Sequence, residues 1–312
     1  MSHGNNQSTH PVGKPGRTVV FFRRIRHRIT STRARVPVLW WRHLGLKPED
    51  VFLGCYPRSG STWLRFTLFE ILTGKPSSFD SVNAAFRGPG DRRRGWPLLP
   101  GQGRFLGTHE LYRPSYRKAV YLVRDVRDVA LSEFAFEKNL GVGPTQFDHY
   151  LEDMLHKGKR HGRWQDHVNS WLDSPLSSNG DLLLIRYEDL RKNSVDEFMK
   201  LTDFLGVRTN RDAVEQAIAN NSVERMREKE DRLYTQENYA AVLRRPLKGV
   251  QPDGRFIRSG KIGGWQDKLS SKQLRFIEEH TAPVLRRLHY PVLTLDADTS
   301  SPVTAFAGSR PE

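Results

Sequence analysis

A short loop between an apolar run and an apolar stretch at helical spacing contains residue types that bind anions. The loop comprises Arg58, Ser59, Gly60, Ser61 and Thr62. A strand that passes through a tight glycine turn into a helix leaves the first backbone N–H groups of that helix pointing at one spot. The partial positive charge of a helix N-terminus makes that spot favourable for an anion. The pattern therefore predicts a phosphate-binding loop.

The loop lacks the spacing of an ATP-binding P-loop. That motif needs a Gly, four residues and then Gly-Lys-Ser/Thr. Here five residues separate Gly54 from Gly60, Ser61 stands where the Lys would be, and the cation is Arg58. The apparatus for a magnesium nucleoside triphosphate is thus incomplete, which disfavours a P-loop kinase or NTPase but keeps it as an alternative. Taken alone, the loop could also be an ordinary turn at a helix start.

Further side chains capable of chemistry follow three other candidate strands. His109 and Glu110 follow the apolar run 104–108, Arg124 follows 119–123, and Tyr187 follows 181–185. A neutral imidazole suits proton abstraction near pH 7, and a guanidinium can bind a phosphate through two parallel N–H bonds. Because ligands of parallel sheets bind at the carboxyl ends of the strands, we expect these residues to share one site.

The order of apolar patterns predicts an α/β fold. Strand patterns alternate with helical ones, which are centred on 63–72, 126–138, 145–155, 164–172, 194–205, 211–220, 222–230 and 271–288. This alternation predicts a P-loop-type central parallel β-sheet flanked by helices on both faces. Residues 75–103 are rich in Gly, Pro and Arg and are expected to form a long irregular connection, and 231–257 is weakly patterned.

The sequence from 56 to 63, YPRSGSTW, resembles the phosphosulfate-binding loop of the sulfotransferases that use 3′-phosphoadenosine 5′-phosphosulfate (PAPS). The family pattern is close to Tyr-Pro-Lys-Ser-Gly-Thr-Thr-Trp, from which this chain departs at Arg58 and Ser61. The resemblance extends over about 51–290. It includes YLVRDVRDVALS at 121–132, YEDL at 187–190 and the Gly-rich basic stretch 256–265.

The resemblance implies a set of cofactor-binding residues. They are Arg58, Ser59, Gly60, Ser61, Thr62, Trp63, Arg124, Ser132, Tyr187, Ser222, Arg258, Ser259 and Gly260. Within this set Arg124 and Ser132 would bind the 3′-phosphate, while Trp63 and Tyr187 would lie at the adenine. Departures from the family patterns occur at Ser259, Gly264 and Gln266 of the last loop, where Lys261 could replace a lost charge, and at Val223, where an aromatic residue is expected.

The resemblance also implies catalytic roles for His109, Arg58 and Ser132. His109 would be the base that takes the proton of the acceptor hydroxyl, and Arg58 would stabilise the leaving phosphate oxygen. Gly107 stands where the family has a Lys, so one cation is missing. Glu110 is a rival base. The loop lacks a magnesium-binding Ser/Thr after a Lys and no Cys/His cluster is present, so no metal is expected.

The acceptor cannot be identified from the sequence. The implied activity is transfer of a sulfuryl group from PAPS to a hydroxyl, or less readily an amine, of a small-molecule, glycan or lipid acceptor. Its pocket would come from 75–103, 134–171 and 231–257, where aromatic residues suggest a partly apolar wall. These aromatic residues are Trp96, Phe134, Phe136, Trp164 and Tyr234. Core packing is the alternative interpretation of them.

The excess positive charge is concentrated near the N-terminus. The chain has 312 residues and a net charge of +15, and residues 1–50 hold 10 of the 50 Lys and Arg residues but 2 of the 35 acidic ones. Residues 17–41 fit a basic amphipathic helix on an anionic membrane, a flexible basic arm or, with fewer serines than usual, a targeting leader. A nucleic-acid-binding or membrane-surface protein therefore stays an alternative, although no specific nucleic acid is expected.

These patterns predict three segments. Residues 1–48 form a basic, partly disordered leader, 49–292 the sulfotransferase domain, and 293–312 a disordered tail. The single cysteine, Cys55, excludes an internal disulfide and fits a reducing compartment. No apolar run approaches the ~20 residues needed to span a bilayer, and no secretory signal is recognised. The expected location is the cytoplasm, with membrane-surface contact through the leader as an option.

Overall fold

The centre of the fold is a parallel β-sheet. The computed structural model describes residues 37, 41, 43–88, 95–139, 143–158, 161–234, 257 and 260–295. Within them β1 (Val51–Cys55), β2 (Phe105–Thr108), β3 (Lys118–Val123) and β4 (Leu182–Arg186) pair in the order β2-β1-β3-β4. Each pairing is parallel. The predicted central parallel sheet is confirmed.

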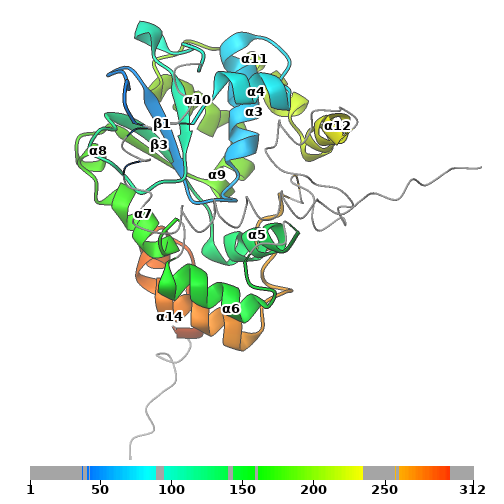
Figure 1. Cartoon of the computed structure of the whole chain (residues 1–312). Helices are drawn as coiled ribbons and strands as arrows, with labels where there is room; N and C mark the ends of the chain where they lie inside the picture. Colours follow the sequence, from blue (N-terminus) through cyan, green and yellow to red (C-terminus); the bar gives the residue numbers. More distant parts are fainter. Residues whose placement is uncertain are drawn as a thin grey trace, which may run out of the picture.

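Helices cover both faces of the sheet (Figure 1). Alternate residues of the strands point to opposite faces. Val51, Leu53 and Cys55 pack with helices α3 (Ser61–Thr73), α10 (Ser194–Phe204) and α11 (Arg211–Asn220). Phe52 and Tyr121 pack on the opposite face with α5 (Val126–Asn139), α7 (Trp164–Leu172) and α14 (Ser271–Arg287). The expected α/β layering is therefore confirmed.

Several shorter elements were not predicted. The bounds are α4 (Phe79–Ala85), η2 (Pro100–Gln102), α6 (Phe147–Leu151), the π-helix η3 (Glu152–Lys157), α8 (Pro175–Ser178), α9 (Tyr187–Lys192) and α12 (Val223–Tyr234). The expectation of an irregular connection over 75–103 is wrong where α4 forms, because Ser78 and Ser81 make a capping box at its start. The helix expected at 145–155 changes from α to π geometry at Glu152.

A glycine lets β1 lie directly against a tryptophan of α7. Trp171 is fully buried, and a Cβ built on Gly54 would lie 2.5 Å from its Cζ2 atom. We expect Gly54→Ala to lower the free energy of unfolding by about 1–3 kcal/mol, because added volume in a packed core forces its neighbours to move. Urea denaturation measures the change. Gly107→Ala in β2 is the control, because a Cβ there meets no atom within 4 Å. Equal midpoints for both variants would contradict this packing.

A buried ion cluster joins α5, α14 and the Gly-rich loop. Arg127 is fully buried, with Nη2 2.8 Å from Asp125 Oδ2 and Nη1 3.0 Å from Glu278 Oε1. Its guanidinium carbon lies 4.1 Å from the ring centroid of Trp265. The backbone N–H groups of Leu293 and Thr294 donate to Glu278 at 3.1 and 2.7 Å. The start of the predicted tail is thus bound to α14, while the proposed segment boundaries stay predictions.

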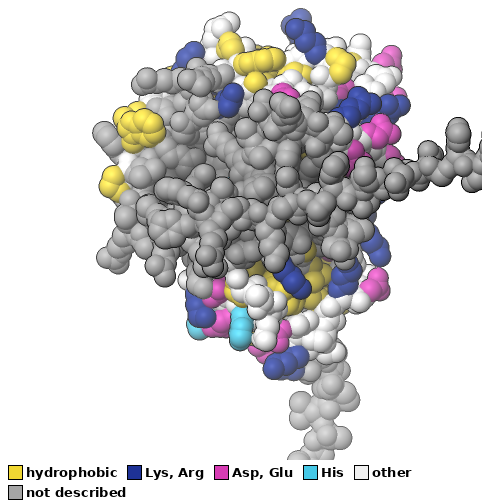
Figure 2. Space-filling model, turned by 45° about the vertical axis from the view of Figure 1, so that its right-hand side comes forward, with side chains coloured by type: hydrophobic (Ala, Val, Ile, Leu, Met, Phe, Trp, Pro, Cys, Tyr) yellow, Lys and Arg dark blue, Asp and Glu magenta, His cyan; other side chains and the backbone are white. Residues whose placement is uncertain are grey.

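The described surface carries charges of both signs, as the face in Figure 2 shows. The basic residues that give the N-terminal segment its excess charge lie outside the described residues, apart from Lys47. The predicted contact of this segment with a membrane or an acidic partner lies outside the described residues as well. No helix in the described ranges has the length and apolar character needed to cross a bilayer.

Candidate active site

The sequence-predicted site residues follow the carboxyl ends of neighbouring strands. Because β1 lies between β2 and β3 in a parallel sheet, the loop after β1 is flanked by His109 after β2 and Arg124 after β3. Tyr187 follows β4, the next strand beyond β3. The carboxyl edge of the sheet thus gathers the phosphate loop, an imidazole, a guanidinium and a phenol.

The loop between β1 and α3 has the backbone of an anion cradle. Gly60, the N-cap of α3, has a φ of 98°, and no side chain caps the helix. A Cβ on Gly60 would lie 2.5 Å from the ring of Tyr187, so this position accepts only glycine without rearrangement. Ser59 is 1% exposed, and its Oγ has no hydrogen-bond partner among the described residues. An unsatisfied buried hydroxyl beside uncapped N–H groups fits a bound anion.

Two of the predicted catalytic residues are in contact. Arg58 has a φ of 67°, and its Nε donates to Ser132 Oγ at 3.1 Å. The guanidinium carbon of Arg58 lies 4.9 Å from the ring centroid of Phe136, one turn further along α5. Ser132 therefore orients Arg58 at the loop.

His109 is held by the end of β1. Its Nδ1 lies 2.9 Å from the carbonyl oxygen of Cys55 and 3.4 Å from Cys55 Sγ. A carbonyl only accepts, so the proton is on Nδ1 and the lone pair is on Nε2. Burial raises the pKa of the Cys55 thiol to about 11, despite a hydrogen bond to Ser61 and the charge of Arg65. Cys55 is thus a packed thiol that orients the imidazole rather than a nucleophile.

Two histidines that the sequence analysis missed surround His109. The ring of His161 lies edge-on to that of His109 with centroids 5.9 Å apart, and His161 Nδ1 lies 3.2 Å from the backbone oxygen of His109. His167 is fully buried, and its Nδ1 lies 2.9 Å from the hydroxyl oxygen of Tyr121. Burial, followed by the charge of His109, lowers the pKa of His167 to about 3. His167 therefore stays neutral and adds no charge beside the candidate base.

Glu110, the rival base, is fixed through its backbone. Its N–H donates to Thr108 Oγ1 at 3.1 Å, and its carbonyl accepts from Trp171 Nε1 at 3.2 Å. The described contacts thus orient the imidazole of His109 directly and the backbone of Glu110. The choice of His109 as base stays a prediction.

Arg124 faces the Gly-rich loop rather than Ser132. Its Nη2 donates to the carbonyl of Lys261 at 2.9 Å and lies 3.4 Å from Asp128 Oδ2. Its guanidinium carbon lies 4.5 Å from the ring centroid of Tyr187. The Nε of Arg124 is buried without a partner among the described residues. An orphaned donor on a guanidinium fits a phosphate ligand.

Asp128 joins the second phosphate motif to the Gly-rich loop. Its Oδ2 accepts from the backbone N–H of Gly263 at 3.0 Å as well as from Arg124. Burial raises the pKa of this carboxyl, with the charge of Arg124 opposing that shift. The hydroxyl of Tyr187 donates to the carbonyl of Gly260 at 3.0 Å, which fixes the loop at a second point. Arg258 and Ser259 lie outside the described residues.

The predicted adenine residues lie on the other side of the phosphate loop. Trp63 is 9% exposed, its Nε1 donates to the carbonyl of Asn221 at 2.8 Å, and the guanidinium carbon of Arg191 lies 4.6 Å from its ring centroid. Ser222 Oγ accepts from the N–H of Arg225 at 3.3 Å and so caps α12. Their roles toward a nucleotide stay predictions.

The aromatic residues proposed for the acceptor wall differ in burial. Trp164 is fully buried and belongs to the core, while Trp96 is 37% exposed. Phe134 packs edge-on to Phe147 with ring centroids 5.2 Å apart, and Phe136 contacts Arg58 as described above. The structure therefore favours Trp96, Phe134 and Phe136 over Trp164 as residues near a ligand. In the described ranges, no group of three His, Cys, Asp or Glu side chains is placed to hold a metal ion.

Comparison with known proteins places this fold and site in a family. The family described as "Sulfotransferase domain" matches residues 108–289, more than half of the chain. Among curated proteins, sulfotransferase 2A1 of Rattus norvegicus is 29% identical over 242 residues, which are 73% of this chain and 81% of the relative. Sulfotransferase 1E1 of Mus musculus is 26% identical over 252 residues, 75% of this chain and 82% of the relative. The chain belongs to the sulfotransferase family.

Solved structures support the same fold. Mouse sulfotransferase SULT7A1 complexed with PAP superposes with a TM-score of 0.61 at 21% identity and covers 87% of this chain and 95% of its own. Retinol dehydratase in complex with androsterone and inactive cofactor PAP gives a TM-score of 0.59 at 22% identity, with 78% and 82% covered. Both likenesses extend over most of the described fold.

Proposed function

We propose that this sulfotransferase moves a sulfuryl group from PAPS to the hydroxyl, or less readily the amine, of a small-molecule acceptor. The observation that carries the proposal is the position of the phosphate loop between His109, with its proton fixed on Nδ1, and Arg124, with an orphaned Nε. The sulfotransferase relatives support the reaction class, and two structural neighbours, although similar in fold alone, are complexed with PAP.

The described residues fit a nucleotide that carries two anionic groups. Ser59 Oγ and the N-terminus of α3 offer donors for one group, beside Arg58. Arg124 offers its unsatisfied Nε for a second group near the Gly-rich loop. We therefore assign the 5′-phosphosulfate to the loop after β1 and the 3′-phosphate to Arg124.

The donor supplies an activated sulfuryl group. A bond forms between the acceptor oxygen and sulfur as the bond from sulfur to the phosphate oxygen breaks, and 3′,5′-adenosine bisphosphate (PAP) leaves. His109 takes the hydroxyl proton on Nε2, because Nδ1 already holds a proton that it shares with Cys55. Arg58, steadied by Ser132, and the N-terminus of α3 stabilise the negative charge that develops on the leaving oxygen.

The acceptor is proposed to lie between the residues after β2 and the aromatic side chains of α5. His161, Phe134 and Phe136 surround this region together with His109 and Arg58. A wall with both imidazoles and phenyl rings suits a small molecule with an apolar body and a hydroxyl group. The proposed place of action is the cytoplasm, supported by the single, unpaired Cys55.

Calorimetry with purified protein in metal-free buffer tests the proposal. We expect PAP to bind more tightly than 5′-AMP or ATP, because 5′-AMP lacks the 3′-phosphate and ATP carries its phosphates at the 5′ end only. A chelator should leave sulfuryl transfer unchanged. Equal affinities for PAP and 5′-AMP, or activity that a chelator abolishes and magnesium restores, would refute the proposal. Tight binding of ATP with magnesium would favour the kinase or NTPase alternative.

A further inference from the structure

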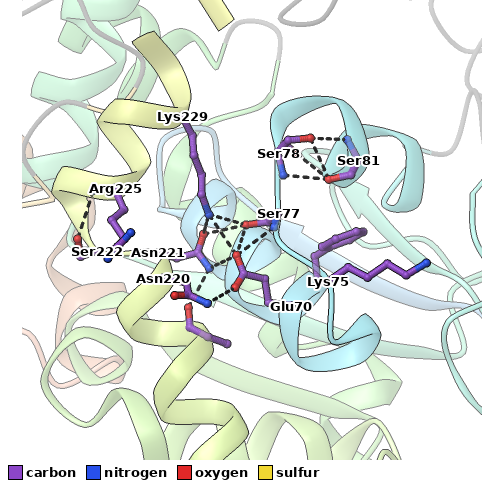
Figure 3. Close-up of polar contacts among 12 residues, drawn as sticks. Glu70, Lys75, Ser77, Ser78, Ser81, Asn220, Asn221, Ser222, Arg225 and Lys229 are labelled. Atoms are coloured by element: carbon purple, nitrogen blue, oxygen red, sulfur yellow. Dashed lines mark hydrogen bonds and ion pairs between the residues drawn. The ribbon is translucent and has the colours of Figure 1, made fainter. Parts of the chain in front are cut away.

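A buried carboxylate lies two turns beyond the phosphate loop on the same helix. Glu70 of α3 is 8% exposed and accepts hydrogen bonds from residues of three other segments (Figure 3). The donors are Ser77 N at 3.0 Å, Ser77 Oγ at 2.5 Å, Asn220 Nδ2 at 2.9 Å, Asn221 Nδ2 at 2.9 Å and Lys229 Nζ at 3.1 Å. So many donors on one carboxylate fix its position and theirs.

Lys229 of α12 completes the cluster. Besides Glu70, its ammonium donates to Ser77 Oγ at 2.8 Å and to Asn221 Oδ1 at 2.7 Å, so each of its three protons has an acceptor. The side chains of Lys229 and Glu70 are 17% and 6% exposed. Figure 3 shows Lys229 reaching down from α12 toward Glu70, with Ser77 and Asn221 on either side.

The ionic form of this pair persists in spite of its burial. Burial alone would raise the pKa of Glu70, but the hydrogen bonds from Ser77, Asn220 and Asn221 together lower it below its usual value. Burial lowers the pKa of Lys229, while the charge of Glu70 opposes that shift. A buried ion pair commonly adds little net stability over apolar residues of the same volume. Its retention in this position therefore invites a role in placing other groups.

The group that the cluster places is Asn221. The side chain of Asn221 binds Glu70, Ser77 and Lys229, and it also donates to the carbonyl of Ala217 at 2.8 Å. The backbone carbonyl of the same residue accepts the indole N–H of Trp63 at 2.8 Å. Asn221 also directly precedes Ser222, the cap of α12. Its side chain is therefore fixed by the cluster, and its backbone contacts one predicted adenine residue and leads into the other.

We propose that Glu70 and Lys229 are positioning residues for the nucleotide base, which act through Asn221 on the indole of Trp63. The inference rests on the proposed function, because it takes Trp63 as the residue on which the base stacks. An indole ring has two torsions, and packing against Phe198 at a centroid distance of 5.7 Å leaves its in-plane orientation to the Nε1 bond. Fixing that bond preorganises the stacking surface, so less order has to be gained on binding.

The same helix also touches the second phosphate motif. Glu230, the residue after Lys229, accepts the backbone N–H of Ile257 at 3.0 Å, and a Cβ on Gly260 would lie 3.4 Å from Val223. An α12 that shifts after loss of the Lys229 anchor would therefore disturb both the base side of the site and the Gly-rich loop. This predicts that the cluster affects affinity for the nucleotide more than the transfer step.

Calorimetric PAP binding by Lys229→Met tests the inference. We expect about tenfold weaker binding, within the range of couplings between residues of one network, and a turnover number at saturating donor that changes less than twofold. Lys200→Met is the matched control, because Lys200 pairs with Glu197 at 3.8 Å on the surface of α10 and is 55% exposed. Lys229→Arg should restore most of the affinity. Thermal unfolding of each variant separates a positioning effect from a general loss of fold.

A double-mutant cycle with Trp63→Phe identifies the route. Phenylalanine keeps an aromatic face but has no N–H for the Asn221 carbonyl, so Lys229→Met should weaken PAP binding less than twofold in that background. A tenfold loss in both backgrounds would overturn the inference. If Lys229→Met does not fold, Glu70→Gln, which keeps one acceptor oxygen, is measured in the same cycle. Wild-type protein that fails to bind PAP refutes the proposed function, whereas normal PAP binding by Lys229→Met refutes only the positioning role.

Discussion

His109→Ala lowers the turnover number about 10²- to 10⁴-fold and leaves PAP affinity unchanged. This range is the usual contribution of a positioned general base. The proton on Nδ1, shared with the carbonyl of Cys55 at 2.9 Å, leaves Nε2 as the basic atom, and alanine removes both nitrogens. Steady-state kinetics with PAPS and a phenol or steroid acceptor, together with PAP calorimetry, measure the two quantities separately.

The pH dependence of the same variants distinguishes the base from its neighbour. In the wild-type enzyme activity falls with decreasing pH, because a protonated imidazole cannot accept the acceptor proton. His109→Ala should lose this acidic limb, and Glu110→Gln should keep it together with most of the activity. If Glu110→Gln instead shows the large loss and His109→Ala the small one, Glu110 is the base.

The strands and the loop at their carboxyl ends could be predicted because their signals are local. The apolar run of β1, the turn at Gly60 and the helical spacing after it lie within one stretch of about 20 residues, and the structure places each where the pattern indicates. Helix α11 (Arg211–Asn220) was predicted to the residue, because Asn210 caps it and a polar connection precedes it. Elements of four to seven residues, such as α4 and α9, are too short to show a helical period.

The contacts within the site were harder to predict, because they join residues far apart in the chain. The spacing of Arg124 and Ser132 suggested one shared phosphate, whereas the structure pairs Ser132 with Arg58 and directs Arg124 to Lys261 and Asp128. The partner of Arg58 is 74 residues away in sequence, and no periodicity reports such a contact. His161 and His167 were missed for the same reason.

The second phosphate motif illustrates how one carboxylate can serve two structures. Asp125, the nearer acidic neighbour of Arg124, is taken by Arg127 at 2.8 Å, so Arg124 is left with the longer 3.4 Å contact to Asp128. Asp128 in turn holds Gly263. Arg124 is therefore weakly neutralised in the absence of a ligand, and a phosphate that approaches its orphaned Nε would compete with a long contact only.

Arg124→Ala should weaken PAP binding about 10- to 100-fold while affinity for 5′-AMP changes less than about threefold. Hydrogen bonds to charged groups contribute about 1.5–3 kcal/mol each, which sets the expected range. 5′-AMP lacks the 3′-phosphate assigned to Arg124, so the variant should abolish the preference for PAP rather than binding of adenosine nucleotides in general. Competition calorimetry with both nucleotides measures this preference directly.

Two further variants separate loss of the phosphate contact from disorder of the Gly-rich loop. Arg124→Lys keeps a positive charge but cannot form two parallel bonds, so its PAP affinity should fall between wild type and Arg124→Ala. Asp128→Asn frees Arg124 from its carboxylate partner but weakens the anchor of Gly263. If Asp128→Asn reduces PAP affinity as strongly as Arg124→Ala, the loop anchor determines binding and Arg124 acts by holding Lys261 in place. If Asp128→Asn binds PAP within threefold of wild type, Arg124 acts on the 3′-phosphate itself.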